Sequence, residues 1–555
     1  MERKWWQNAI AYQIYPKSFC DSNGDGIGDI RGIISKLDYL QDLGVDVVWI
    51  SPMYRSPMVD NGYDISDYYD IDPQFGTMAD MDELISEADK RGIKIIMDLV
   101  INHSSDQHAW FQNALTGPDA PYRDYYVFKD GKDGRPPNNW RSQFGGSAWE
   151  QVPDGQYYLH VFAKQQPDLN WENPKLRQEL TDMVNFWLEK GLGGFRVDAI
   201  TYIKKKQDFA DLPADADDGM GDIYHACLNQ PGIGDFLTEL REKTFDRFDC
   251  MTVAEAPGVP YEDLGDYISD HGYFSMIFDF SYADLDLENS NGVWCKPTPW
   301  TVNHFRELLY KSQLAVQKEG WGAVYLENHD QPRSLTKYLP EADRKYPGIT
   351  MLATLYFLLR GTPFIYQGQE LGMDNCPMDS IDEFDDLSTK DQYQRGLDEG
   401  LTPEEALRLT AARSRDMART PFQWDDTANA GFTTGTPWLK VNPAYHTVNA
   451  KAQCADAHSI HAYYKELVRL RKHSEYSDIL GYGTFAPTLE QYDNVVAYTR
   501  TWEGKRLLVI NNYQNKEIAI HLDEAIQTVV LNNYEGDAPS GQDITLKPYQ
   551  SLVLA

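Results

Sequence analysis

The strongest constraint on the fold is a repeat of short apolar runs, separated by amphipathic stretches, over the first 370 residues. The runs are almost continuously apolar, which is typical of strands covered on both faces, as in a parallel sheet. Eight such runs predict strands at residues 10–15, 45–51, 93–100, 194–200, 251–256, 273–280, 323–330 and 362–369.

Segments with helical spacing of apolar residues lie between most of these runs. Residues 33–43, 81–91 and 176–188 carry apolar side chains three or four positions apart. Because strand and helix alternate, the sequence predicts βα units, and eight units predict an α/β fold closed into a (β/α)8 TIM barrel. A doubly wound open sheet is the alternative, but no glycine-rich phosphate-binding motif follows the first run.

Two segments interrupt the repeat and a third follows it. Residues 105–171 are too many for one helix and are rich in Asn, Gly, Pro and aromatic residues, which predicts an inserted domain after the third strand. An acidic stretch over residues 374–405 is a second insertion. From residue 479 the pattern changes to alternating strands, which predicts a C-terminal antiparallel β-sandwich over 479–555. Residues 1–104 and 172–478 then form the barrel domain.

The composition of the chain limits its partners. The 555 residues carry a formal net charge of −34, which disfavours nucleic acid and anionic membranes because both are polyanions. No stretch approaches the roughly 18 apolar residues of a membrane span, and the N-terminus lacks the apolar run of a signal peptide. Six cysteines without a CxxC pair predict free thiols in a reducing compartment. We therefore expect a cytoplasmic monomer that acts on a small molecule without an organic cofactor.

Acidic residues at or near the C-terminal ends of four predicted strands indicate a catalytic site. They are Asp98, Asp198, Glu255 and Asp330. The C-terminal strand ends of a barrel form the active site of barrel enzymes, and a buried carboxylate is costly unless a partner pairs with it. A salt-bridged helix cap explains a single such residue well, but it explains four of them poorly.

Two of these carboxylates have neighbours that predict different roles. Arg196 lies two residues before Asp198 and shares its strand face, so it should lower the pKa of Asp198 and keep this residue ionised, as a nucleophile requires. Glu255 lies in an apolar run, where burial should raise its pKa and keep it protonated as a general acid. Glycoside hydrolysis uses such a pair of carboxyls. The three lysines at 204–206, just after this strand, are expected to form a solvated face.

The motifs around these residues resemble those of the α-amylase superfamily of glycoside hydrolases, and most of all its oligo-1,6-glucosidase and dextran glucosidase group. The resemblance covers nearly the whole chain, and the eight motifs occur in order. They are AYQIYPKSF at the first strand, NGYDI at 61–65, DLVINH at 98–103, QPDLNW at 166–171, GFRVDAI at 194–200, TVAEA at 252–256, ENHDQPR at 327–333 and ARTPFQW at 418–424. Each motif is weak alone, but all eight together are specific.

The resemblance implies a role for each matched position. Asp198 would be the nucleophile, Glu255 the acid/base and Asp330 a third carboxylate that holds two sugar hydroxyls and distorts the ring. Asp64 and Arg419 resemble an ion pair that closes the back of the pocket, so that one terminal glucose is removed at a time. The family is retaining, which predicts that the two catalytic carboxyls lie about 5–5.5 Å apart. The first sugar site would be lined by Tyr63, Asp64, His103, Phe144, Phe162, Gln166, Arg196, Ala199, His329 and Arg419.

A loop after the first strand is a separate candidate for a metal site. Its alternating oxygen ligands suit a hard cation such as Ca2+, although Gly32 stands where an EF-hand would have a bidentate Glu. A solvated Asp/Gly turn is the alternative. The resembling enzymes bind Ca2+ in the same loop, so we expect a structural calcium ion remote from catalysis. The ligands would be Asp21, Asn23, Asp25, Ile27 through its carbonyl, and Asp29.

The preferred glucosidic linkage is less constrained than the chemistry. QPDLNW is typical of relatives that prefer α-1,6 links, but Ala199 follows the nucleophile where those relatives usually have Val. A small residue at this position is more typical of enzymes that act on α-1,4 links. We expect release of terminal glucose from short isomalto-oligosaccharides, with some activity on maltose.

Three kinds of relative are the alternatives. Trehalose-6-phosphate hydrolases share most motifs but need a basic contact for the phosphate, and the sequence assigns none. Sucrose isomerases carry RLDRD after the sixth strand, where residues 284–288 of this chain, Asp284 to Glu288, read DLDLE without Arg. Non-enzymatic partners of amino-acid transporters have a membrane span and have lost the catalytic carboxylates, whereas this chain keeps all three.

Overall fold

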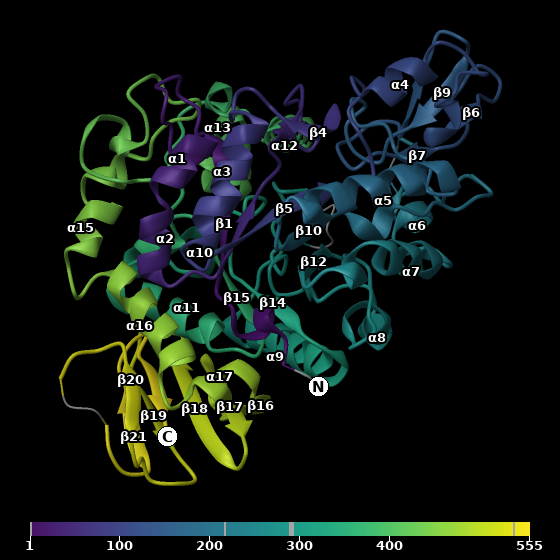
Figure 1. The fold of residues 1–555 in the computed structure, drawn as a ribbon. Coiled ribbons are helices and arrows are strands. Elements are labelled where there is room, and N and C mark those ends of the chain that lie inside the picture. Colours follow the sequence, from purple (N-terminus) through teal and green to yellow (C-terminus); the bar gives the residue numbers. More distant parts are fainter. Residues whose placement is uncertain (1–2, 216–217, 288–292, 537–538) are drawn as a thin grey trace.

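The computed structural model describes residues 3–215, 218–287, 293–536 and 539–555. At its centre lies a closed barrel of eight parallel strands, which confirms the predicted (β/α)8 fold (Figure 1). Strands that follow one another in the chain are neighbours in the barrel, and the last strand pairs with the first. The barrel strands are β1 (Ala11–Ile14), β2 (Val47–Ile50), β5 (Lys94–Val100), β10 (Gly194–Asp198), β12 (Met251–Glu255), β13 (Met276–Phe278), β14 (Gly322–Val324) and β15 (Thr362–Tyr366).

Each of the eight predicted runs overlaps a barrel strand, but the run at 323–330 was predicted too long and one residue late. β14 ends at Val324, so Asp330 lies in the loop beyond the strand and not at its end. Two polar side chains hold this loop away from the sheet: Glu327 accepts a hydrogen bond from the backbone of Ser334 at 2.6 Å, and Asn328 accepts one from the backbone of Asp330 at 2.8 Å. A strand would leave these polar groups without partners.

Helices cover the outside of the barrel, and capping residues set where several of them begin. Asp29 caps α1 by accepting from the backbone of Gly32, and Thr77 caps α3 in a capping box with Asp80. Residues 33–43, predicted as one helix, form parts of two. The helices from the first strand to the eighth are α1 (Ile30–Ser35), α2 (Leu37–Leu43), α3 (Met78–Asp89), α5 (Pro174–Glu189), α6 (Tyr224–Cys227), α7 (Ile233–Lys243), α8 (Leu264–Ile268), α9 (Val302–Glu319), α10 (Ser334–Tyr338) and α11 (Tyr346–Phe357).

The predicted insertion after the third strand carries one helix and two small sheets. A three-stranded sheet has the order β6-β9-β8, and β7 pairs in parallel with β11 from the segment after β10. Residues 199–228 share an apolar core with the insertion, so this part of the chain, which the sequence analysis left with the barrel, also supports the insertion. The elements are α4 (Ala109–Ala114), β6 (Phe128–Asp130), β7 (Trp140–Arg141), β8 (Trp149–Gln151), β9 (Gln156–Leu159) and β11 (Gly221–Asp222). A two-stranded sheet of β3 (Tyr54–Arg55) and β4 (Asp67–Ile71) precedes it.

The acidic segment after the last barrel strand forms a pair of helices. α12 and α13 contact each other, and the short α14 that follows carries Arg419. Thr402 caps α13 in a capping box with Glu405, which explains why helical pattern starts there in the sequence. The helices after the barrel are α12 (Leu387–Asp398), α13 (Pro403–Arg413), α14 (Asp416–Arg419), α15 (Ala450–Cys454), α16 (Ile460–His473) and α17 (Ser477–Tyr482).

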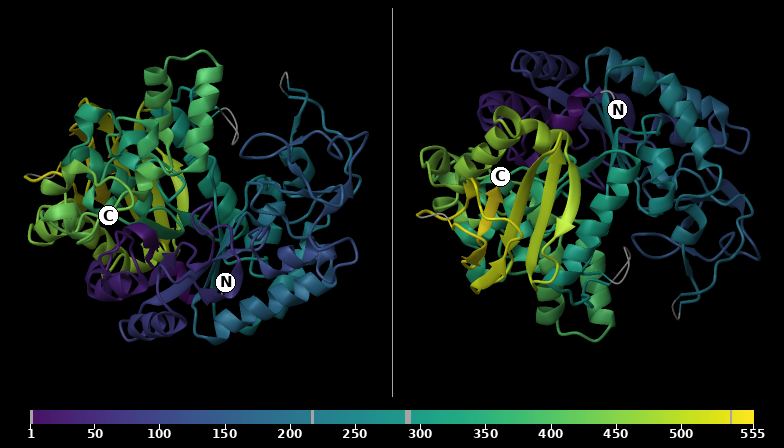
Figure 2. Two further views of the ribbon diagram at one scale, coloured as in Figure 1. Left: turned by 90° about the horizontal axis from the view of Figure 1, so that it is seen from above. Right: turned by 90° about the horizontal axis from the view of Figure 1, so that it is seen from below.

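The C-terminal segment forms the predicted antiparallel β domain. A five-stranded sheet of order β16-β17-β18-β22-β20 shares an apolar core with a two-stranded sheet of β19 and β21. This domain and the insertion lie on opposite sides of the barrel (Figures 1 and 2). The strands are β16 (Thr484–Thr488), β17 (Val495–Trp502), β18 (Lys505–Asn512), β19 (Ile518–His521), β20 (Val529–Asn532), β21 (Asp543–Leu546) and β22 (Ser551–Leu554).

Two buried arginines bind the C-terminal end of α11, Arg500 from the C-terminal domain and Arg471 from the barrel domain. Arg500 on β17 donates to the carbonyl of Leu358 at 2.7 Å, and Arg471 on α16 donates to the carbonyl of Phe357 at 3.0 Å. These carbonyls lie at the C-terminal end of α11, where backbone oxygens lack helical partners and the helix dipole favours positive charge. The arginines therefore satisfy backbone groups that the domain interface buries.

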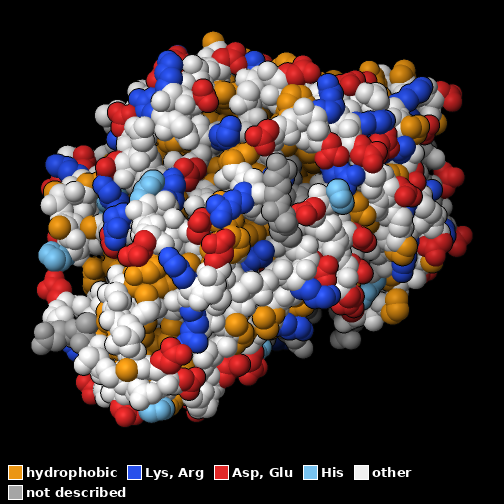
Figure 3. All heavy atoms as spheres, turned by 60° about the horizontal axis from the view of Figure 1, so that its bottom comes forward, with side chains coloured by type: hydrophobic (Ala, Val, Ile, Leu, Met, Phe, Trp, Pro, Cys, Tyr) orange, Lys and Arg blue, Asp and Glu red, His pale blue; other side chains and the backbone are white. Residues whose placement is uncertain are grey.

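The surface and the cysteines agree with the expectations from composition. On the face drawn in Figure 3, acidic and basic side chains are intermixed, with apolar side chains scattered between them. All six cysteines are free, as predicted. Over the described ranges, the chain has no helix with the length and apolar character that crossing a membrane requires.

Candidate active site

Three neighbouring barrel strands bring the predicted catalytic side chains together. β5 carries Asp98, β10 carries Arg196 and Asp198, and β12 carries Glu255, and the strands lie in the order β12-β10-β5. Arg196 is in register with Asp98 on the neighbouring strand, so both reach the same level of the barrel. Because the strands are parallel, these side chains all lie towards the C-terminal end, where barrel enzymes have their active sites.

The Arg196 guanidinium binds three carboxylates at once. Its Nη1 lies 2.7 Å from Asp98 Oδ1 and 2.6 Å from Asp198 Oδ1, and its Nη2 lies 2.6 Å from Glu255 Oε2. The side chain of Arg196 is only 2% exposed, so these pairs are poorly screened by water. One cation thus holds Asp198 and Glu255 side by side and compensates part of their charge.

Burial raises the pKa values of both carboxyls, and it raises that of Glu255 further than that of Asp198. Burial raises the pKa of Glu255 to about 8, which confirms the expectation for a general acid. Burial also raises the pKa of Asp198 to about 6, and the attraction of Arg196 offsets only part of this rise. Arg196 thus lowers the pKa of Asp198, as the sequence predicts, but burial outweighs it and leaves this pKa above its ordinary value; Asp198 still ionises before Glu255.

Asp330 reaches the same place from the loop after β14 and lies next to His329. His329 Nε2 lies 3.1 Å from Asp330 Oδ2 and 2.6 Å from the hydroxyl of Tyr63, whose ring stacks on the imidazole. Burial would raise the pKa of Asp330, but the attraction of His329, Arg415 and Arg419 outweighs it and holds this pKa below its usual range. Since burial lowers the pKa of His329 to about 3, that ring is neutral at pH 7. The two arginines therefore keep Asp330 ionised there.

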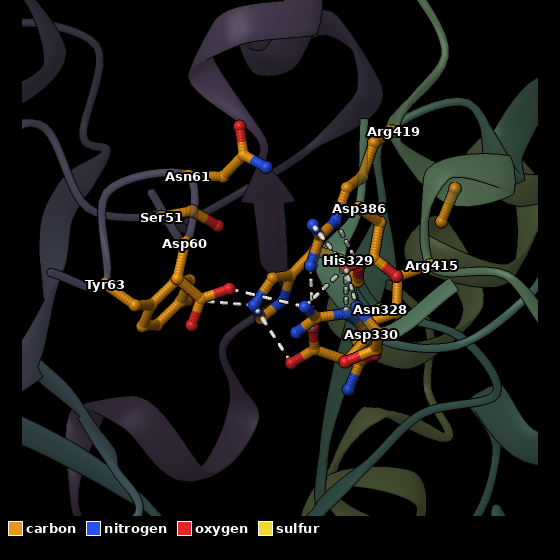
Figure 4. A network of polar contacts seen from close by, with 12 residues as sticks. Ser51, Asp60, Asn61, Tyr63, Asn328, His329, Asp330, Asp386, Arg415 and Arg419 are labelled. Carbon is orange, nitrogen blue, oxygen red and sulfur yellow. Dashed lines mark hydrogen bonds and ion pairs between the residues drawn. The ribbon is translucent and has the colours of Figure 1, made fainter. Parts of the chain in front are cut away.

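The back of the site is closed by an ion pair that differs from the predicted one. Arg415 Nη2 lies 3.3 Å from Asp60 Oδ1, and the two side chains face each other across the site in Figure 4. Asp64 instead accepts hydrogen bonds from the hydroxyl of Ser56 and two backbone N–H groups. Arg419 instead donates to the carbonyl of His329 and to Asp330. The predicted pair of Asp64 and Arg419 was therefore wrong.

The predicted sugar-site residues from the insertion also lie at this place. Gln166 Nε2 donates to Asp60 Oδ2 at 3.0 Å, and His103 Nε2 lies 3.0 Å from the carbonyl of Tyr63. The rings of Phe144 and Phe162 lie 5.7 Å apart, and Phe162 also contacts the rings of His103 and Tyr202. The insertion thus supplies an aromatic and amide wall for one side of the site.

Ala199, the residue after Asp198, has a left-handed backbone with φ 42° and ψ 35°. This conformation is uncommon for a residue with a side chain, and it costs a branched side chain more than it costs Ala. It turns the backbone N–H of Ala199 towards Glu255 Oε2 at 3.3 Å. The unusual backbone therefore serves the carboxyl on the neighbouring strand.

A cavity of about 760 Å3 opens beside Glu255 and Asp330. Glu255 and Asp330 line it, together with the aromatic residues Tyr202, Tyr261 and Trp294. This volume lies in the range of small-molecule sites. Carboxyl groups at the base and aromatic side chains on the walls suit a polyhydroxylated ring, which offers hydroxyls and an apolar face.

Comparison with known families decides the relationship. The family described as "Alpha amylase, catalytic domain" matches residues 13–483, and the one described as "Alpha-amylase SusG C-terminal domain" matches residues 495–553. The chain belongs to the α-amylase catalytic-domain family. The second match agrees with the antiparallel sheet at the C-terminus, so both parts of the fold occur together in relatives.

Relatives from this family match along their full lengths and carry different names. The oligo-1,6-glucosidase of Parageobacillus thermoglucosidasius is 45% identical over 561 residues, which covers 100% of this chain and 99% of the relative. The trehalose-6-phosphate hydrolase of Bacillus subtilis is 42% identical, over 99% of this chain and 98% of the relative. The structure of an isomaltulose synthase from Klebsiella sp. LX3 has a TM-score of 0.95 and 42% identity, over 100% of both chains. Family membership therefore leaves several substrates open.

Sequence reasoning missed several residues of this family site. Asp60 stands directly before NGYDI, and Arg415 stands four residues before the Arg419 that was chosen. Trp49 donates to Asp98 Oδ2 at 2.8 Å, and Gln13 Nε2 lies 2.9 Å from His329 Nδ1. Gln13 and Trp49 lie inside apolar strands, where the sequence does not distinguish them from ordinary core residues. Asp60 and Arg415 were visible in the sequence as a second acid and a second base near the chosen residues, but only the folded structure shows that they pair.

The candidate calcium loop lies on the surface, and its side chains bind its own backbone. Asp21 accepts from the N–H groups of Gly24 and Gly26, and Asp29 accepts from Ser22 and from the start of α1. Within the described ranges, no three Asp, Glu, His or Cys side chains come together as metal ligands. An ion in this loop would thus also need the amide oxygen of Asn23 and the carbonyl of Ile27.

Proposed function

We propose that the protein is an exo-acting, retaining α-glucosidase that releases terminal glucose from short α-glucosides. The observation that carries this proposal is the pair of carboxyls, Asp198 and Glu255, held by one Arg196 guanidinium beside a cavity that Glu255 and Asp330 line. The names of the full-length relatives support the class of substrate.

In the first step, Asp198 attacks the anomeric carbon while Glu255 donates its proton to the leaving glycosidic oxygen. The carbon–oxygen bond to the aglycone breaks, and a covalent glucosyl-enzyme forms. At pH 7 the pKa of about 6 leaves Asp198 ionised, and the pKa of about 8 leaves Glu255 protonated. In the second step Glu255 takes a proton from water, whose oxygen replaces Asp198 on the same carbon. Two displacements retain the anomeric configuration.

The proximity of the two carboxyls supports a retaining mechanism. Both bind nitrogens of the same guanidinium, Asp198 through Nη1 and Glu255 through Nη2. Inverting enzymes need carboxyls about 6.5–9.5 Å apart, with a water between them, whereas retaining enzymes hold theirs about 5–5.5 Å apart. Two carboxyls bound side by side on one guanidinium suit the shorter spacing.

The closed rear of the site supports removal of one sugar at a time. The ion pair of Asp60 and Arg415 lies behind Tyr63, and Arg415 also contacts Asp330 at 3.3 Å and Asp386. A chain could not pass through this wall without separating buried charges, which is costly. The substrate therefore enters with its non-reducing end first.

The first-step acid and base predict a bell-shaped pH dependence. kcat/KM is expected to rise through a pKa of about 6 as Asp198 ionises and to fall through about 8 as Glu255 loses its proton. Initial rates on 4-nitrophenyl α-glucoside, at low substrate concentration between about pH 5 and pH 9, measure this profile. A profile that is flat above neutral pH would contradict the role of Glu255. The variant Glu255→Gln should lose the alkaline limb.

Ala199 is the position at which we expect linkage preference to change. The variant Ala199→Val is expected to shift preference towards isomaltose, because a branched side chain beside Asp198 narrows the cavity as in α-1,6-preferring relatives. Its left-handed backbone should also make the variant about 1–2 kcal/mol less stable. The ratio of kcat/KM for isomaltose to that for maltose measures the shift, and Ala199→Gly, which relieves the strain without adding bulk, is the control. An unchanged ratio in Ala199→Val would reject the idea.

The charges around the cavity make a phosphorylated sugar a poor substrate. Glu262, Asp279 and Asp284 line the wall beyond Glu255, and they would repel a phosphate. Arg413 also lines this wall, but Asp284 binds it at 2.9 Å. Lys311, over the ring of Tyr261, is the other cation there. Neutral α-glucosides are therefore favoured over trehalose 6-phosphate.

A substrate panel tests the proposed function directly. We expect glucose from isomaltose, panose and maltose, and at least tenfold lower kcat/KM on trehalose 6-phosphate and sucrose. Proton NMR during the first turnovers is expected to show α-glucose before mutarotation, and β-glucose first would contradict a retaining mechanism. Of the segment compared with sucrose isomerases, Glu288 lies outside the described residues. Product analysis with sucrose therefore decides that alternative.

We also propose a structural calcium ion in the loop of residues 21–29. Alternating oxygen donors support it. Removing the ion with a chelator should lower the melting temperature by a few degrees and leave kcat unchanged, as calorimetry and rate measurements can show. An identical melting temperature with and without added Ca2+ would exclude it.

The six free cysteines support our further proposal of a cytoplasmic location.

A further inference from the structure

Lys205, which follows the nucleophile strand, is buried and not solvated as the sequence suggested. Its side chain is 3% exposed, and its Nζ lies 2.7 Å from Asp168 Oδ2, an atom of the insertion. Burying an ammonium costs several kcal/mol unless it is paired and hydrogen-bonded, so this position is determined by its partners. None of the proposed catalytic steps uses it.

The ammonium of Lys205 binds three different segments of the chain. Besides Asp168, it donates to Asn102 Oδ1 at 2.8 Å and to the carbonyl of Tyr202 at 2.6 Å. Asn102 belongs to the loop after β5, and Tyr202 to the turn after β10. An ammonium has N–H donors and no acceptor, and here it donates to Asn102 and Tyr202 while its charge pairs with Asp168. The loops around the sugar site are thus fixed to one another at Lys205.

Because an ammonium only donates, it fixes which way the amide of Asn102 points. The oxygen of Asn102 must face Lys205, and its Nδ2 then faces His103 Nδ1 at 3.2 Å. An amide nitrogen donates, so His103 Nδ1 must accept. Burial lowers the pKa of His103 to about 4, so the ring is neutral at pH 7 and carries one proton. That proton is then on Nε2.

The contacts on the other side of the ring allow a proton on Nε2. Gln166 Nε2 lies 3.2 Å from His103 Nε2, but its two hydrogens are used by Asp60 Oδ2 and the carbonyl of Tyr63. His103 Nε2 lies 3.0 Å from the carbonyl of Tyr63, which can only accept. Gln166 is oriented in a similar way, since its Oε1 accepts from the backbone of Ala163 and its Nε2 donates to Asp60. The nitrogens of His103 and Gln166 thus both present hydrogens around Tyr63.

We propose that Lys205 is a positioning residue that acts through Asn102 to keep the proton of His103 on Nε2, so that this ring donates to the carbonyl of Tyr63 and holds Tyr63 in place at the first sugar site. The location of the sugar site rests on the proposed function, whereas the position of the proton does not. If the proton were on Nδ1, the unprotonated Nε2 and the carbonyl oxygen of Tyr63 would both be acceptors and could not form a hydrogen bond.

The position of the proton can be measured in the intact protein without turnover. In protein labelled with 15N on histidine rings, long-range proton–nitrogen correlation should show His103 Nε2 as the protonated nitrogen, with the signals assigned by their loss in His103→Gln. In Lys205→Met the amide of Asn102 is free to turn, and His103 should show both tautomers. Lys205→Arg, in which the new side chain also only donates, should keep the native pattern.

Lys205→Met leaves Asp168 buried without its cation and could fail to fold, so the double variant Lys205→Met with Asp168→Asn serves beside it. This variant removes both charges and keeps the shapes of the side chains. In it we expect mixed tautomers and a rise of KM for 4-nitrophenyl α-glucoside of about 3- to 10-fold, with a smaller change in kcat. A proton on Nδ1 of the native protein would overturn the proposal. A native tautomer pattern in the double variant would overturn it as well.

Discussion

Replacing Asp198 by Ala is expected to lower kcat on α-glucosides by about four orders of magnitude or more, while the fold is kept. The reason is that covalent catalysis has no substitute once its nucleophile is removed, as nucleophile variants of other enzymes show. Asp198 contributes little to stability, because burial raises its pKa to about 6 and so disfavours its charged form in the native state. Arg196 keeps Asp98 and Glu255 as partners in the variant.

Turnover of 4-nitrophenyl α-glucoside measures the loss, and thermal unfolding shows whether the fold survives. Added azide, a small nucleophilic anion, should enter the space that the carboxylate leaves and restore part of the rate. One displacement then occurs in place of two, so the product should be the β-glucosyl azide. The control is Asp89→Ala, which removes an exposed carboxylate of α3 and should leave kcat unchanged. Activity of Asp198→Ala near that of the control would refute the assignment.

The sequence was sufficient for the barrel because its strands are covered on both faces. A run such as residues 93–100 is apolar except for Lys94 and Asp98, as a strand buried on both faces requires, so β5 was visible without geometry. Residues 323–330 have a similar apolar start, but tertiary contacts of Glu327 and Asn328 end the strand early. The extent of an element depends on such partners, which a one-dimensional pattern does not contain.

The difference between sequence pattern and tertiary contacts also explains which site residues could be predicted. Asp198 and Glu255 are the last residues of β10 and β12, so their positions in the barrel are predictable from the strand pattern. The closing ion pair could not be chosen in this way, because Asp60 and Asp64, like Arg415 and Arg419, are four residues apart and equally acidic or basic. Only the folded loops decide that Asp60 meets Arg415. The burial of Lys205 was hidden for the same reason, since its acceptors come from distant segments.

Replacing Arg196 by Met is expected to be the most damaging single change to stability. Arg196 compensates three carboxylates that lie in a buried site, and removing one partner of a buried ion pair typically costs about 3–5 kcal/mol. Met keeps most of the volume of the side chain, so the loss reports charge and hydrogen bonds more than packing. Activity should also fall, because the pKa of Asp198 would rise and leave less of the ionised nucleophile at pH 7.

The pH dependence of this loss distinguishes a charge effect from a packing effect. The native pKa values, about 6 for Asp98 and Asp198 and about 8 for Glu255, lie above the value of about 4 in the unfolded chain. The native state therefore holds protons that the unfolded chain has released, and stability falls as pH rises towards these values. Arg196 lowers all three pKa values, so without it they rise further and the fall continues to higher pH.

The stability deficit of Arg196→Met should thus be smallest below a pH of about 6, where Asp98 and Asp198 are protonated in both native proteins, and should grow above it. Urea unfolding of both proteins at several pH values measures this difference. Arg196→Lys keeps a charge but has one nitrogen in place of the guanidinium fork, so it should recover part of the stability and little of the activity. A deficit that is equal at all pH values would mean that Arg196 acts through packing. The carboxyl pair would then need another source for the difference between its pKa values.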